Sequence, residues 1–130
     1  MTARCTASPL ARKLGIGPDS RVLLDGAPGG FAVEGVTAHH RPGAAPYDVV
    51  LLFALDLARL ERRWPPLAAR LTVAGRLWVC WPKQFSGVAS DVSDGVVREH
   101  GLHHGLVDVK VCSIDETWSG LAFVRRLADR

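Results

Sequence analysis

The chain has few cysteines, few aromatic residues and no long apolar run. Its three cysteines, Cys5, Cys80 and Cys112, are odd in number and show no C-x-x-C spacing, which argues against a disulfide framework or a zinc knuckle. Cys80 and Cys112 stand in apolar segments, so we expect small buried side chains. No apolar run reaches the roughly 18 residues of a membrane span, and residues 1–9 lack the apolar core of a signal peptide. These absences predict a cytoplasmic protein that does not enter a membrane.

Several catalytic and ligand-binding motifs are also missing. No serine stands in a G-x-S-x-G turn, which excludes the nucleophile elbow of many hydrolases. No Gly-Lys-Ser/Thr follows a glycine turn, which excludes a P-loop. The pairs His39-His40 and His103-His104 cannot each chelate one metal, because adjacent strand residues point to opposite faces. With no cysteine or carboxylate at ligand spacing, we predict no metal site.

What remains is an ordinary globular composition. The chain has 130 residues, of which 48% are hydrophobic and 22% charged, so residues 1–130 are predicted to form a single α/β domain. The formal net charge of +3 permits nucleic-acid binding but does not require it.

The segment 22–31, Val-Leu-Leu-Asp-Gly-Ala-Pro-Gly-Gly-Phe, is the most informative part of the sequence. Three apolar residues run into Asp25 and then into a glycine-rich turn. This is typical of a parallel strand that ends beside a nucleotide-type pocket, because glycine tolerates positive φ and lets a ligand approach the backbone. The segment therefore predicts a Rossmann-like sheet.

Apolar periodicity predicts the other elements. Ser8 and Gly15 are expected to bound a first helix, Asp56 to cap a second that Pro65-Pro66 breaks or kinks, and Ser93 to cap a third that ends near Gly101. Core strands are expected at 21–24, 36–39, 48–53 and 76–81, followed by an antiparallel hairpin of 106–114 and 118–126.

This order resembles a shortened class I methyltransferase fold, which closes a parallel sheet with one antiparallel hairpin. Residues 23–30 resemble the first methyltransferase motif, in the Gly-Ala-Pro-Gly-Gly form of heat-shock-type ribosomal RNA methyltransferases. Residues 47–52 and 73–79 resemble two further strands of that fold, and residues 106–126 resemble its hairpin. The resemblance implies a three-layer Rossmann-like domain with a mostly parallel sheet, and it implies S-adenosylmethionine as cofactor.

The chain also resembles a small bacterial domain-of-unknown-function family, found mainly in actinobacteria. The segments that carry this resemblance are 9–16, 77–83 and 105–112, together with Asp115-Glu116-Thr117-Trp118-Ser119-Gly120-Leu121. That family implies a fold and no activity.

One feature of the methyltransferase pattern is missing. In that fold the glycine turn lies under the methionine part of S-adenosylmethionine, and an acidic residue at the end of the second strand holds the ribose hydroxyls. Here that strand ends in Thr37-Ala38-His39-His40. The segment before the third strand is also short. These departures favour loss of the cofactor.

Open α/β sheets nevertheless place ligands beyond the carboxyl ends of their strands. The candidate ligand-binding residues at those ends are Asp25, Gly26, Ala27, Gly29, Gly30, Asp56, Trp81 and Lys83. Lys83 can meet a phosphate or a carboxylate and Trp81 can stack on a base. The simpler alternative is a core tryptophan and a solvated loop lysine.

Two other polar groups allow two interpretations each. Arg59, Arg62 and Arg63 recur at helical spacing, opposite the apolar face, and form either a nucleic-acid footprint or a solvated outer face. The segment Asp115-Glu116-Thr117 is either a site at the hairpin tip or a turn in which Asp115 bonds the backbone.

Three functions remain open. The first is a non-catalytic binding or regulatory module for a small molecule or a protein, which predicts a shallow or side-chain-filled crevice above 26–30. The second is a small S-adenosylmethionine-dependent methyltransferase, which predicts an open pocket there. The third is binding of another nucleotide or phosphate at the same turn. The free edge of the sheet also permits a homodimer.

Overall fold

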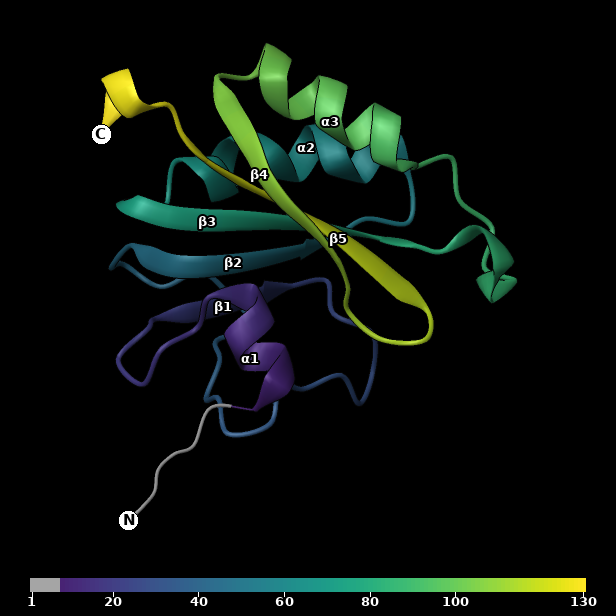
Figure 1. Ribbon diagram of the computed structural model, residues 1–130, viewed down its shortest axis with the longest axis horizontal. Coiled ribbons are helices and arrows are strands. Elements are labelled where there is room, and N and C mark those ends of the chain that lie inside the picture. Colours follow the sequence, from purple (N-terminus) through teal and green to yellow (C-terminus); the bar gives the residue numbers. More distant parts are fainter. Residues whose placement is uncertain (1–7) are drawn as a thin grey trace.

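The computed structural model describes residues 8–130, so Cys5 lies outside the described part of the chain. One five-stranded sheet separates two helical layers (Figure 1). The elements follow one another as α1 (Pro9–Leu14), β1 (Val22–Asp25), β2 (Tyr47–Phe53), α2 (Leu57–Ala68), β3 (Leu71–Pro82), α3 (Asp94–His103), β4 (Leu106–Ser113) and β5 (Trp118–Arg125). Single 3-10 turns occupy Gln84–Ser86 and Leu127–Asp129. The expected α/β architecture is confirmed.

The strand order is β1-β2-β3-β5-β4, with the first three strands parallel. The hairpin of β4 and β5 then adds antiparallel to β3, as the sequence predicted. Parallel strands have their carboxyl ends at the same edge of a sheet. The last residues of β1, β2 and β3, which are Asp25, Phe53 and Pro82, therefore lie at one edge. A candidate site at that edge can draw on three loops.

Two apolar clusters cover the two faces of the sheet. Leu23 and Val50 belong to the cluster with α2, whereas Val22, Leu24 and Leu51 belong to the cluster with α1. Neighbouring strand residues thus face opposite layers, and both faces are buried. This explains the continuous apolar runs in β1 and β2.

Helix α1 is short but well bounded. The Ser8 hydroxyl accepts the Ala11 N–H at 3.1 Å, and Gly15 ends the helix with a φ of 79°. Both were predicted. Glycine suits that position because a Cβ destabilises the left-handed conformation.

Of the two outcomes predicted at Pro65-Pro66, a break or a kink in α2, the break does not occur. The helix continues through both prolines to Ala68, and Trp64 and Leu67 are both buried beneath it. Each proline removes one backbone donor, which leaves the carbonyls of Glu61 and Arg62 without a helical partner. Glu61 and Arg62 are exposed, so water can satisfy these carbonyls while burial of the apolar face holds the helix together.

The prediction of a strand at 36–39 is also wrong in extent. Within the described residues, only an isolated parallel bridge forms there, between His39 and Leu23. Strand β3, in contrast, is longer than predicted: Gly75 lies inside it, where the register with β2 shifts. The Gly75 Cα faces the Tyr47 carbonyl closely enough that an added Cβ would stand 3.0 Å from it.

The hairpin tip is a turn of the predicted kind. The Asp115 Oδ1 accepts the N–H groups of Thr117 and Trp118, each at 2.8 Å. Trp118 is 7% exposed and covers the sheet. Ser93 stands at the N-cap of α3 as predicted, but its hydroxyl makes no capping bond.

Cys80 and Cys112 both lie in strands, and Cys80 is fully buried. Burial raises the pKa of the Cys80 thiol well above its ordinary value, which disfavours the reactive thiolate form. Among the described helices, none combines the length and apolarity needed to cross a bilayer.

Candidate functional site

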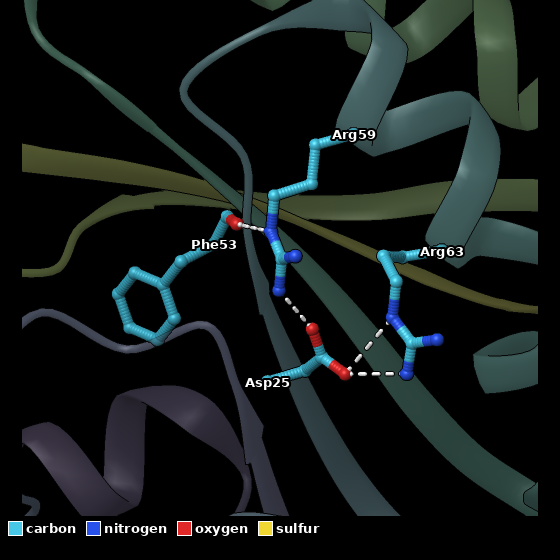
Figure 2. Close-up of polar contacts among 4 residues, drawn as sticks. All are labelled: Asp25, Phe53, Arg59 and Arg63. Carbon is cyan, nitrogen blue, oxygen red and sulfur yellow. Dashed lines mark hydrogen bonds and ion pairs between the residues drawn. The ribbon is translucent and has the colours of Figure 1, made fainter.

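The acidic residue that ends β1 is held by two arginines from α2. Asp25 is 6% exposed, and its Oδ2 lies 2.7 Å from the Nη2 of Arg63. Its Oδ1 pairs with the Nη2 of Arg59. Figure 2 shows both guanidinium groups converging on this one carboxylate. A nearly buried carboxylate must be paired in this way, because an unpaired buried charge is strongly destabilising.

Arg59 also covers the start of the glycine turn. Its Nε donates to the Phe53 carbonyl at 2.8 Å, which fixes the guanidinium above the ends of β1 and β2 (Figure 2). A Cβ added to Gly26 would overlap that guanidinium. Gly26 has a φ of 74° and is itself exposed, but the side on which a Cβ would stand is occupied by the Arg59 guanidinium.

The rest of the turn is open. Ala27 packs against the cluster that contains α1. Gly29 and Gly30 are exposed, and nothing lies within 4 Å of a Cβ added to either. Phe31 closes the turn with a hydrogen bond to the Pro28 carbonyl at 3.0 Å. The turn thus has Arg59 against one side of Gly26, and open space beside Gly29 and Gly30.

Asp56 serves the helix that carries the two arginines. Its Oδ1 accepts the Arg59 N–H at 2.8 Å, so it is the N-cap of α2, as its place in the sequence suggested. This contact orients the first turn of α2 and with it Arg59.

Trp81 and Lys83 do not meet Asp25. Trp81 is 6% exposed and belongs to the core cluster with α2. The Lys83 Nζ donates to the Ser113 hydroxyl and to the Asp115 carbonyl, each at 2.6 Å. Both residues line a cleft of about 790 Å³ whose rim includes the exposed Phe85 and Val111. Lys83 therefore links the end of β3 to the hairpin tip. The cleft that it lines has both polar and apolar side chains.

The three arginines of α2 do not share one face, although the sequence predicted a common face for them, as either a nucleic-acid footprint or a solvated outer surface. Arg59 and Arg63 turn toward Asp25, with side chains 26% and 27% exposed. Arg62 remains exposed on the helix. Attraction to the buried carboxylate outweighs solvation for the two residues that can reach it.

The segment 36–39, which bridges to β1 at His39, is not followed by an acidic residue at the position where the resembling fold holds the ribose. The next residues are His40 and Arg41, and His39 itself lies 2.7 Å from the Tyr47 hydroxyl through its Nδ1. Tyr47 also accepts the Gly43 N–H at 2.9 Å. This polar network fixes the loop before β2.

Three of the five histidines, His100, His103 and His104, lie at the end of α3. The rings of His100 and His104 stack with centroids 4.0 Å apart, and His100 also meets the buried Trp64. The His100 Nε2 is buried without a partner. Burial, followed by the neighbouring His104, lowers the pKa of His100. In residues 8–130, no group of three or more His, Cys, Asp or Glu side chains is placed to hold a metal ion.

Sequence reasoning missed the triad of Asp25, Arg59 and Arg63. One signal was present: Arg59 and Arg63 are four residues apart, so they lie on the same side of a helix. Their negatively charged partner, Asp25, lies 34 residues from Arg59 and 38 residues from Arg63 in the sequence. Only the crossover from β1 to α2 brings the three together.

Comparison with known proteins gives the fold but no family. No family model and no curated protein matches this chain. A candidate methyltransferase from Pseudomonas syringae matches 89% of this chain and 96% of its own, with a TM-score of 0.54 and 13% identity. The likeness to the bacterial domain-of-unknown-function family therefore stays a prediction.

Two longer enzymes match part of the chain. Magnesium protoporphyrin IX methyltransferase from Synechocystis PCC 6803, solved with bound SAH, gives a TM-score of 0.48 at 14% identity over 64% of this chain. The N-methyltransferase NodS from Bradyrhizobium japonicum WM9 gives 0.44 at 15% identity over 65%. The present chain spans 47% and 53% of these two proteins. Its own mixed sheet and the match to the Pseudomonas protein identify the fold as a minimal class I methyltransferase-like Rossmann fold.

Proposed function

We propose that this protein is a non-catalytic binding or regulatory module built on a methyltransferase-like scaffold. One observation carries the proposal: the Arg59 guanidinium, held by Asp25 and by the Phe53 carbonyl, occupies the space beside Gly26 on the side where a Cβ would stand. That space is where the resembling fold places the methionine part of its cofactor.

The charge at this position supports the same proposal. The methionine part of S-adenosylmethionine carries a positive sulfonium, a positive amino group and one carboxylate, so its net charge is positive, and the cluster of two guanidinium groups with Asp25 is also net positive. Like charges at short range repel, and the repulsion is stronger at partly buried positions than in water. Asp25, the carboxylate that precedes the turn directly, is already paired with both arginines.

A specific finding favours a second candidate, a small S-adenosylmethionine-dependent methyltransferase. The Pseudomonas protein that matches almost end to end is described as a candidate methyltransferase. Gly29 and Gly30 also leave part of the turn open. This candidate requires Arg59 to move aside when the cofactor binds.

Thermal unfolding with S-adenosylmethionine and S-adenosylhomocysteine separates the two. A ligand at a hundredfold excess over its Kd adds about 2.7 kcal/mol to the free energy of unfolding. We expect no shift of the melting temperature with either compound. An Arg59→Ala variant that gains a shift absent from the natural protein would identify Arg59 as the group that blocks cofactor binding at the turn.

The opposite result has its own control. A melting-temperature shift in the natural protein that is abolished in Gly29→Val would overturn the binding-module proposal. Nothing lies within 4 Å of a Cβ at Gly29, so the loss of the shift would reflect lost cofactor binding and not a disturbed fold. Gly95→Ala in α3, also in open space, should leave any such shift unchanged. Conversion of S-adenosylmethionine to S-adenosylhomocysteine would then establish the enzyme.

A further inference from the structure

The triad at the end of β1 carries more positive than negative charge. Two guanidinium groups share the single carboxylate of Asp25. The Asp25 side chain is 8% exposed and those of Arg59 and Arg63 are 26% and 27% exposed. The excess positive charge therefore faces partly toward solvent, at the edge where this class of sheet binds ligands.

Both guanidinium groups keep unused donors. Each has five N–H groups. Arg59 uses its Nε and one Nη2 bond, and Arg63 uses its Nε and Nη2 on the same Asp25 oxygen. Neither Nη1 has a protein acceptor within residues 8–130. Because Asp25 and Phe53 already hold these side chains, a ligand loses less conformational entropy in ordering them.

The glycine turn supplies further donors close by. Gly26 lies against the Arg59 guanidinium, and the Pro28–Phe31 turn follows directly. The N–H groups of Gly29 and Gly30 donate to no acceptor in the described part of the chain, and the space beside them is open. Backbone N–H groups of such turns bind anionic oxygens.

We propose that Arg59, Arg63 and the Gly29-Gly30 turn form a binding site for a phosphate-bearing anion, such as the diphosphate of a nucleotide. A phosphate offers three acceptor oxygens and up to two negative charges, so it can accept from both guanidinium groups at once, and a diphosphate extends this toward the turn that begins at Gly26. The inference deepens the proposed binding function and rests on it.

Isothermal titration with sodium pyrophosphate and with ADP, at low ionic strength and pH 7.5, tests the site. We expect both to bind, with ADP the tighter if the ligand is a nucleotide and equal affinity if the phosphate alone is recognised. Arg63→Gln should raise the Kd at least tenfold. Arg62→Gln removes the same charge one residue away on the exposed surface and should change the Kd less than twofold.

Amide chemical shifts give a measurement on the unaltered protein, which remains valid if Arg63→Gln does not fold. Pyrophosphate should move the amide signals of Gly29 and Gly30 more than those of other exposed glycines such as Gly95. The inference is overturned by absence of saturable binding, by equal losses in the two arginine variants, or by shifts confined to other basic segments. If the protein binds neither pyrophosphate nor S-adenosylmethionine, the phosphate site is ruled out and the proposed binding-module function still stands. Binding of S-adenosylmethionine overturns the proposed function instead.

Discussion

The indole N–H of Trp78 donates to the Leu14 carbonyl across 3.0 Å, which joins the middle of β3 to the last residue of α1. Both residues are fully buried. The carbonyls of the last helical turn lack partners within the helix, so this bond satisfies a group that burial would otherwise leave unpaired. It also fixes α1 against the face of the sheet that carries Trp78.

Replacing this indole should be costly. Trp78→Phe removes buried volume and leaves the Leu14 carbonyl without its donor, so we expect a loss of about 2–4 kcal/mol in the free energy of unfolding. Urea denaturation followed by circular dichroism measures it. Leu127→Ala, at a side chain that is 80% exposed, should change the same quantity by less than about 0.5 kcal/mol.

Two glycines of α3 should respond in opposite directions to alanine. A Cβ at Gly101 would overlap the buried ring of Phe123 on β5, whereas a Cβ at Gly95 meets nothing within 4 Å. Gly101→Ala should therefore destabilise the protein by about 1–3 kcal/mol. Gly95→Ala should stabilise it by about 0.4–1 kcal/mol, because alanine loses less backbone entropy. Equal effects in thermal unfolding would contradict the packing of α3 on β5.

The hairpin tip offers a second matched pair. Asp115→Ala removes the acceptor of two backbone N–H groups, those of Thr117 and Trp118. We expect a loss of about 1–2 kcal/mol in the free energy of unfolding. Glu116→Ala, at the exposed neighbour, should have almost no effect. If the two variants were equally stable, the turn would not depend on Asp115.

Acidification should weaken the packing at the end of α3. Burial, and then His104, lowers the pKa of His100 in the folded state, with Glu61 opposing and His103 adding to the shift. The unfolded chain therefore binds a proton more readily than the folded one. The stabilising effect is complete above the ordinary histidine pKa of about 6.5 and is lost as the pH falls below it.

Urea unfolding at pH 7.5 and at pH 5.5 tests this dependence. The decrease in stability between the two should be smaller in His100→Gln than in the natural protein. His40→Gln, at an exposed residue, should keep the full decrease. A pH dependence that survives unchanged in His100→Gln would place its origin in other groups.

Local patterns predicted much of the fold. Ser8 and Gly15 bound α1 because a hydroxyl cap and a left-handed glycine act within one turn of helix. In the same way, a few adjacent residues were enough to predict the buried strand β2 and the hairpin turn at Asp115. Propensity was misleading at Pro65-Pro66, where burial of Trp64 and Leu67 by the sheet outweighs two lost backbone bonds.

The sequence alone determined that β1 ends in an acidic residue and a glycine turn, because strand, carboxylate and turn are contiguous. Only the tertiary structure decided how that turn is used. It folds α2 over the ends of β1 and β2, and so places Arg59 and Arg63 on a carboxylate more than 30 residues away in the chain. Electrostatic pairing at a buried position depends on distances in space, and no pattern of neighbouring residues encodes such distances.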